Sequence, residues 1–198
     1  MNLPSLSFHS GALAGVIVGA VLATFSGIVG NQYEAFSLRR EKERSAALLF
    51  GEVLSTVRIL LEGAETSSRS GDPFGPVTRR LLATSRREMA IYERNRESLV
   101  ALQEAQLRSD IHQVALRIIT ALDALAESFV TPDVLAIPDS GEIAGSRQWM
   151  FGFLMENMQR IPGLTQRLGR IARHNFEQYG EAVRIGIAEP SVAEPPAA

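Results

Sequence analysis

The chain lacks cysteine altogether, although it has 198 residues. This absence excludes disulfide bonds, thiolate metal sites and thiol nucleophiles, and it fits a reducing compartment. Lysine is nearly absent as well, because Lys42 is the only lysine among 20 basic residues. The formal net charge of −2 gives no electrostatic signature of a nucleic-acid-binding surface. We therefore expect no nucleic acid partner.

Charge is missing from the first 33 positions, which contain no Asp, Glu, Lys or Arg. Within them, residues 11–30 form the apolar and small-residue run GALAGVIVGAVLATFSGIVG. About 20 helical residues at roughly 1.5 Å each cross a hydrocarbon core of about 30 Å. We predict a transmembrane helix over residues 11–30, after a short N-terminal segment over residues 1–10.

Two other interpretations of this run stay open. Val21, Leu22 and Ala23 would pass as a signal-peptide cleavage site, but a signal peptide has a basic n-region and a shorter apolar stretch. Residues 1–10 contain no Lys or Arg. The run could also be a buried helix of a soluble core. The flanking residues favour the anchor.

The flanks also predict the orientation. Arg39, Arg40, Lys42 and Arg44 follow the run, whereas the N-terminal side supplies no basic side chain. Basic residues beside a span remain on the cytoplasmic side, and acidic neighbours count little. We expect a single-pass protein of the inner (cytoplasmic) membrane with its N-terminus outside, its C-terminal domain in the cytoplasm, and the lipid bilayer as a partner.

Small residues recur every four positions within the predicted span. With this spacing one side of a helix carries almost no bulky side chains, so the backbone of another helix can approach closely. Self-association or packing against another membrane helix is one interpretation, and a small-residue-rich composition is the other. The positions are Gly11, Gly15, Gly19, Ala23 and Gly27.

The rest of the chain reads as helices. Apolar residues at intervals of three and four predict an amphipathic helix over residues 36–61, which would continue out of the membrane. A loop composition follows from Gly63 to Pro76, after which Thr78 could cap a second helix that ends between Asn95 and Leu102. Its inward candidates are Leu81, Leu82, Met89 and Tyr92.

The third and fourth helices have longer apolar stripes. The third should end before Pro132, and Ser146 could cap the fourth. Pro162 and Gly163 predict a kink or a break in the fourth, with Thr165 as a possible restart. The third stripe is Leu107, Ile111, Val114, Ile118, Ala121, Leu122, Leu125 and Phe129, and the fourth is Trp149, Met150, Phe153, Leu154, Met158, Ile161, Leu164, Leu168, Ile171, Phe176, Tyr179 and Val183.

These patterns predict an all-α fold, in which a transmembrane helix continues into an up-down four-helix bundle over residues 31–186. The tail over residues 187–198 is rich in proline and acidic residues and should be disordered. The same apolar stripes could instead form a coiled coil with a second copy.

Motifs that carry chemistry are missing. No P-loop, dinucleotide fingerprint, zinc-protease, hydrolase or kinase signature occurs, and the Glu-x-x-His pairs of a di-iron bundle are absent. His9, His112 and His174 are scattered. Asp110 and His112 are two residues apart, so they point to different helix faces, and we interpret them as surface or rim residues. We predict no catalytic residue, no metal site and no cofactor.

One polar residue stands out because it lies among apolar ones. Glu52 sits within LLFGEVL, and a buried carboxylate would need a partner. Tyr92 and Asn95 are three residues apart and share one helical face. The sequence allows a buried polar cluster of Glu52, Tyr92 and Asn95. It favours a solvated Glu52, because the apolar neighbours of Glu52 can fill the inward side of the helix without it.

These segments also support a resemblance. A hydrophobic anchor, an LLFGEV helix and a later IYERNRESLVAL segment loosely resemble a group of small bacterial single-pass membrane proteins with a helical soluble domain and no assigned function. The resemblance covers residues 11–129, with Glu52, Tyr92 and Asn95 at the matching positions. It implies a helical, membrane-tethered protein and supplies no activity.

Three functional hypotheses follow. The first is a membrane-anchored interaction or scaffold protein without catalytic activity, which binds an unknown protein partner. The second is a sensory or regulatory component that transmits signals through the first helix. The third, which applies if the topology is inverted, is a periplasmic helical protein related to the envelope or to phage.

Overall fold

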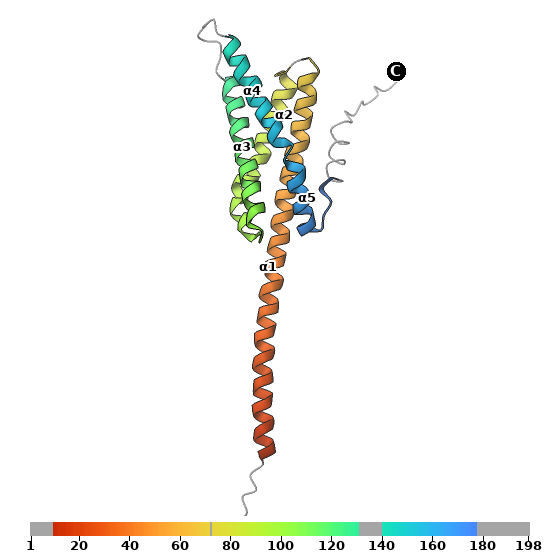
Figure 1. Ribbon diagram of the computed structural model, residues 1–198, viewed down its shortest axis with the longest axis vertical. Helices are drawn as coiled ribbons and strands as arrows, with labels where there is room; N and C mark the ends of the chain where they lie inside the picture. The colour runs from red at the N-terminus through yellow and green to blue at the C-terminus, as the bar shows by residue number, and fades with distance from the viewer. Residues whose placement is uncertain (1–9, 72, 131–139, 178–198) are drawn as a thin grey trace, which may run out of the picture. The chain divides into compact units, whose positions relative to one another are not determined.

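The computed structural model of the chain describes the backbone of residues 10–71, 73–130 and 140–177, and the side chains of residues 36–71, 73–129 and 144–177. Within these ranges the fold is all-helical and contains no strand, as predicted. The elements are shown in Figure 1, and the chain divides into two compact units, Met1–Lys42 and Glu43–Ala198. We call them unit 1 and unit 2.

Unit 1 contains the first part of α1 (Ser10–Arg69). Among its described side chains, the Arg40 guanidinium lies 4.5 Å from the centre of the exposed Phe36 ring. No helix qualifies as long and apolar enough to cross a bilayer over the residues that the structure describes. The side chains of the predicted small-residue stripe lie outside the described residues, so its packing stays a prediction. These are Gly11, Gly15, Gly19, Ala23 and Gly27.

Unit 2 is a bundle in which successive α-helices run in opposite directions, except that the last two follow one another in the same direction (Figure 1). Between α1 and α2 (Pro76–Asn95) the contacts pair residues in reverse order: the Phe50 ring lies 5.8 Å from the Tyr92 ring, and Ser67 bonds to Thr78. The same reversal joins α2 to α3 (Ala105–Val130), and α3 to the pair α4 (Ser140–Met158) and α5 (Ile161–Ala172). The predicted up-down bundle is confirmed for this unit.

The first helix is longer than predicted. A loop was expected from Gly63, but α1 continues to Arg69. Ala64 is fully buried there, and the Cα of Gly63 faces the Leu81 side chain of α2. Because α2 covers this last part of α1, packing outweighs the helix-weakening composition of the segment. The connection between the two helices is therefore only residues 70–75.

The start of α2 also differs from the prediction. Gly75 occupies the N-cap position and Pro76 begins the helix, a position that suits proline because the amide it lacks would have no helical partner. Thr78 is no cap. Its side chain is buried, and its hydroxyl donates to Ser67 Oγ at 3.0 Å. The helix ends at Asn95, within the predicted range, and a 3-10 helix, η1 (Arg96–Ala101), follows.

In α3 the residues of the predicted apolar stripe are buried from Leu107 to Leu125, as expected. The fourth helix breaks, and it does so before the proline: α4 ends at Met158, and α5 begins at Ile161 with Pro162 in its first turn. Ser146 lies inside α4 and caps nothing, because α4 already begins at Ser140. Thr165 does not restart the helix, since its hydroxyl bonds back to the Pro162 carbonyl at 3.1 Å.

The end of α5 returns the chain to α1. Arg173 adopts a left-handed conformation with φ 55°, and the Arg44 side chain of α1 donates to the Ala172 carbonyl at 3.0 Å. Phe176 is buried against Gly51, at the place where a side chain on residue 51 would otherwise lie. Residues 178–198 contain the rest of the predicted stripe and the predicted tail, and they lie outside the described residues.

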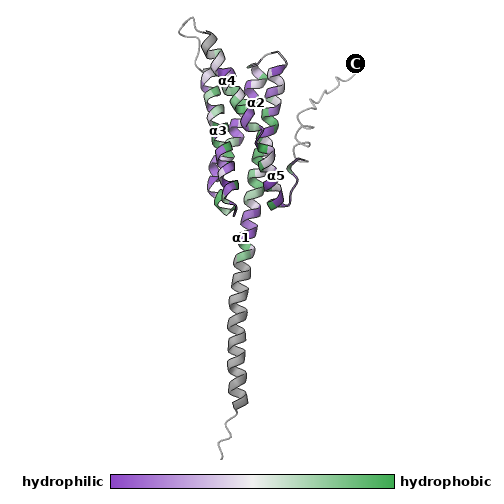
Figure 2. Cartoon of the chain, viewed as in Figure 1, coloured by the Kyte–Doolittle hydropathy of each residue, from purple (hydrophilic) through white to green (hydrophobic). Residues whose placement is uncertain are grey.

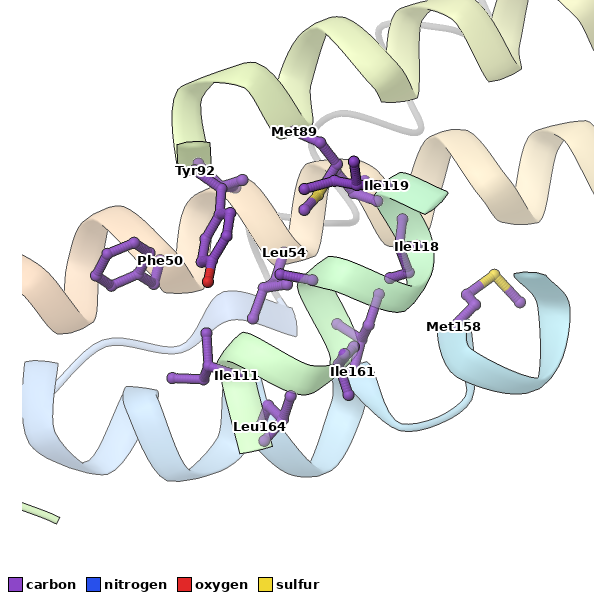
Figure 3. Packing of buried hydrophobic residues seen from close by; sticks show 14 of the residues in the cluster. Phe50, Leu54, Met89, Tyr92, Ile111, Ile118, Ile119, Met158, Ile161 and Leu164 are labelled. Atoms are coloured by element: carbon purple, nitrogen blue, oxygen red, sulfur yellow. The ribbon is translucent and has the colours of Figure 1, made fainter. Parts of the chain in front are cut away.

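One hydrophobic core fills unit 2. Figure 3 shows the Tyr92 ring beside Phe50, with residues of α3 and α5 close by. Hydrophobic and hydrophilic residues mix along each helix in Figure 2, as expected for helices that bury one side. The largest fully buried side chains are Phe50, Leu54, Leu61, Met89, Tyr92, Leu102, Leu107, Ile111, Ile118, Leu125, Leu154 and Ile161.

Candidate functional site

The structure does not bring the predicted polar cluster together. Tyr92 is buried, but Glu52 is exposed on α1. Asn95 is half-buried, and its side-chain amide donates to the Ile91 carbonyl of its own helix at 2.8 Å. The buried side of α1 is occupied by Phe50, Val53 and their apolar neighbours, so a carboxylate is not needed there. The solvated alternative for Glu52 is the correct one.

Tyr92 finds its partner on α3 instead. Its hydroxyl lies 2.7 Å from Nδ1 of the half-buried His112. Burial raises the pKa of Tyr92 to about 12, against a smaller opposing effect of the Arg96 charge. The phenol is therefore protonated at neutral pH, and it links α2 to α3 rather than serving as a base. The sequence offered one signal for His112, which directly follows Ile111 at the edge of the buried stripe.

Two arginines each bind two carboxylates. Arg86 of α2 pairs with Asp123 of α3 at 2.5 Å and with Glu93 at 2.8 Å. These two hydrogen bonds, to Asp123 first, raise the pKa of Arg86.

Arg167 of α5 pairs with Asp110 of α3 at 2.7 Å and also with Glu104. The hydrogen bond from Arg167 lowers the pKa of Asp110. Both sites join helices, and in each of them the arginine charge is already matched.

A small cavity of about 280 Å³ lies beside the second arginine, between α3 and α5. Asp110, Arg160 and Arg167 line it, but Arg167 is engaged as described and Arg160 lies 3.5 Å from Glu156. In the part of the chain with described side chains, no group of three or more His, Asp or Glu residues is placed to hold a metal ion. The unusual surface of unit 2 is elsewhere.

That surface is on α4. From Ala144 to Met155 the only charged residue is Arg147, and it turns inward: its guanidinium donates to the Ser128 carbonyl and lies 5.4 Å from the Phe129 ring centre. We call the exposed residues of this stretch the charge-free face. It consists of Ala144, Gly145, Ser146, Gln148, Trp149 and Gly152.

Trp149 dominates the charge-free face. Its side chain is 66% exposed and stacks on Phe153, with ring centres 5.9 Å apart and an angle of 14° between the planes. A Cβ at Gly145 or Gly152 would meet nothing. By contrast, α2 exposes Arg79, Arg80, Arg87 and Arg94, α3 exposes Arg117 and Glu127, and α5 exposes Arg170. The exposed residues from Ala144 to Met155 of α4 carry no charge, and the next exposed charge on this helix is Glu156.

A hollow adjoins this face. Its volume is about 460 Å³, and its walls come from the connection between α1 and α2, from α2 and from α4. The Phe74 ring lies 5.8 Å from both the Phe129 and the Phe151 rings, and Arg79 donates to the Phe74 carbonyl at 2.7 Å. We call it the Phe74 hollow. Its lining residues are Pro73, Phe74, Gly75, Pro76, Arg79, Ala144 and Gln148.

The sequence placed Trp149 in the inward stripe of the fourth helix, and this prediction is wrong. Phe151, Leu154 and Met155 are buried on α4, whereas Trp149 points outward. The apolar residues of α4 are spread around the helix axis, so their spacing alone does not separate the inner side of the helix from the outer side. The missing charges between residues 147 and 156 are the signal that could have revealed the face.

No known protein family matches the chain, and neither a curated protein nor a solved structure matches it.

Proposed function

We propose that this chain is a membrane-anchored helical interaction protein. Residues 11–30 form its single-pass anchor in the inner (cytoplasmic) membrane, and unit 2 is its interaction module on the cytoplasmic side. The observation that carries this proposal is the charge-free face of α4. The proposed role involves no catalytic step.

The composition of this face supports binding to a protein. A helix that faces water normally carries charged residues on its outer side, and the cores of protein interfaces are depleted in charge and enriched in Trp and Met. Trp149 also has the residue type that most often dominates binding energy. The guanidinium of Arg147 bonds to the Ser128 carbonyl, so no exposed cation interrupts the face between residues 144 and 155.

The anchor is supported by the sequence. An uncharged run of 20 residues at positions 11–30 has the length of a bilayer span. Fractionation of cells that express the full chain tests it. We expect the chain to stay in the membrane after alkaline carbonate extraction. Val18→Arg with Leu22→Arg should release it, because each arginine costs about 2.5–3.5 kcal/mol of insertion free energy at a helix centre.

Ala83→Arg is the matched control, since Ala83 is exposed on α2 and the variant should remain in the membrane. Recovery of the unaltered chain in the soluble fraction would contradict the anchor.

The topology needs a separate test. The chain has no cysteine, so single cysteines at Ser5 and at the exposed Ser98 can be labelled in intact cells with a membrane-impermeant maleimide. We expect labelling of Ser5→Cys and protection of Ser98→Cys. The inverse pattern would reject the cytoplasmic assignment and favour the periplasmic alternative.

The binding role is tested by a photo-crosslinking aromatic residue at position 149. We expect a covalent protein adduct in living cells, because the side chain at 149 is exposed on the charge-free face. The same residue at Arg87, which is exposed on the charged side of α2, is the control and should give none. Absence of any adduct at 149 would reject the interaction role for this face.

A further inference from the structure

The charge-free face and the Phe74 hollow lie next to each other on one helix. Ala144 and Gln148 belong to both, and Trp149 directly follows Gln148. One surface of unit 2 therefore presents an exposed aromatic side chain and, beside it, an open hollow of about 460 Å³. Cavities of about 300–1,000 Å³ hold drug-sized ligands, so the hollow has room for an indole ring.

We propose that this surface binds a second copy of the chain, with Trp149 of each copy in the Phe74 hollow of the other. A two-fold interface uses the same patch on both subunits, so that residue i contacts residue j and residue j contacts residue i. A protrusion and a hollow side by side meet that condition, because a two-fold axis between them makes both contacts at once. This inference rests on the proposed function and names the partner of its binding face.

The electrostatics of the hollow suit an indole. Arg79 lines it and is exposed, and its guanidinium carbon lies 4.8 Å from the centre of the Phe129 ring. Arginine beside the face of tryptophan is an attractive pair. The charge-free face also brings no like charges together when it meets itself, whereas two copies of the arginine-rich exterior of α2 would repel each other.

The size of the surface determines how strong the contact is. Twelve residues of α4 at about 1.5 Å each, with a helix width of about 10–12 Å, cover roughly 200 Å². A standard interface buries about 800 Å² on each partner. The α4 face with its hollow is smaller, so the dimer should be weak in solution. Anchoring in one bilayer raises the effective concentration of the copies and promotes the contact.

Cysteine crosslinking of the full chain in native membranes tests the proposal. Gln148 lines the hollow and precedes Trp149, so it lies near the proposed axis, and Gln148→Cys should meet its own counterpart and form a disulfide-linked dimer on mild oxidation. Ser109→Cys is the control, because Ser109 is exposed on α3 and should not crosslink. Adding Trp149→Glu to Gln148→Cys should lower the dimer yield at least tenfold.

Trp149 is exposed, so its replacement should leave helix content and thermal unfolding of unit 2 unchanged, and circular dichroism verifies this. Equal dimer yields at positions 148 and 109 would overturn the proposal. A dimer yield at position 148 that Trp149→Glu leaves unchanged would overturn it as well. Crosslinking of position 148 to a different protein would also overturn it, although the binding role of the face would then stand.

The membrane anchor and the dimer are separate proposals, and different results would reject them. If the chain is found outside the membrane, the anchor is wrong, and the same crosslink is measured in the soluble fraction at high protein concentration. A Trp149-dependent dimer there still supports the second copy as the partner. No dimer there rejects it.

Discussion

The Phe176 ring lies directly against the Cα of Gly51, so that a Cβ at position 51 would overlap the ring. Gly51 is part of α1, and Phe176 follows α5, at the other end of the described chain. Nearby, the Arg44 side chain bonds to the Ala172 carbonyl at 3.0 Å. These contacts hold the segment after α5 on α1 and complete this side of the bundle.

Gly51→Ala should therefore destabilise unit 2. Alanine favours a helix by about 1 kcal/mol over glycine, but the added methyl group displaces Phe176, and overpacking costs about 1–3 kcal/mol. We expect a net fall in the free energy of unfolding in urea, measured on the full chain in mild detergent. Gly163→Ala is the control, because its Cβ meets nothing and the variant should lose no stability. A more stable Gly51→Ala chain would contradict the contact.

Sequence periodicity predicted the architecture well where one side of a helix is apolar and the other charged. In α3 the buried positions from Leu107 to Leu125 match the stripe, because most residues on the exposed side, such as Gln106, Gln113 and Arg117, are polar. Helix ends were predicted less well. The composition from Gly63 onward favours a loop, yet α1 continues to Arg69 because α2 packs on it.

The candidate site could not be predicted in the same way. Tyr92 was recognised as important, but its partner His112 lies on another helix, and pairing across the bundle depends on how η1 turns the chain. The charge-free face was missed because apolar spacing treats an exposed Trp149 and a buried Leu154 alike. The hollow is formed by the connection before α2 together with α4. These segments are far apart in the sequence, so no local sequence pattern indicates that they lie side by side.

Tyr92 should make the stability of unit 2 fall at alkaline pH. Its pKa is raised from 10.0 to about 12 by burial, so the folded state holds the phenolic proton where the unfolded state has lost it. The stabilisation is complete below pH 10 and is lost as the pH rises through the folded pKa. The shift corresponds to about 2–3 kcal/mol at 1.36 kcal/mol per unit.

Tyr92→Phe tests this prediction. At pH 8 it should lose about 1 kcal/mol, because the hydrogen bond to His112 disappears. Between pH 10 and 12 its free energy of unfolding should fall less than that of the unaltered chain, as measured by urea denaturation at each pH. Parallel curves for the two proteins would show that Tyr92 does not titrate as described.

Asp110 should make the stability of unit 2 fall at acid pH. Its pKa is lowered by the hydrogen bond from Arg167, so the pair stabilises the fold above the ordinary carboxyl pKa of 3.8 and this contribution is lost as the pH falls through the lowered value. Both side chains are partly exposed, and such pairs contribute about 0–1 kcal/mol.

We expect Asp110→Asn to reduce stability at pH 7 by less than about 1 kcal/mol, and this deficit should shrink as the pH falls through the lowered pKa of the carboxyl. Glu52→Gln, at an exposed position of α1, is the control. An Asp110→Asn deficit that does not shrink as the pH is lowered would mean that the side chain acts through packing instead of charge.

Asn157 should be replaceable by an apolar residue with a gain in stability. Its side chain is only 1% exposed, and its Nδ2 donates to the Phe153 carbonyl at 2.7 Å, but its Oδ1 has no hydrogen-bond partner among the described residues. A buried polar atom left unpaired costs about 1–3 kcal/mol. Asn157→Leu has a similar size and removes that cost, and the Phe153 carbonyl keeps its place in the helix.

We therefore expect Asn157→Leu to raise the free energy of unfolding by about 1 kcal/mol in urea. Asn157→Asp, which would bury a charge in the same place, should be strongly destabilising at pH 7 and less so at acid pH. A destabilised Asn157→Leu would instead show that Oδ1 accepts a hydrogen bond, from ordered water or from a bound partner, that the apolar side chain cannot replace.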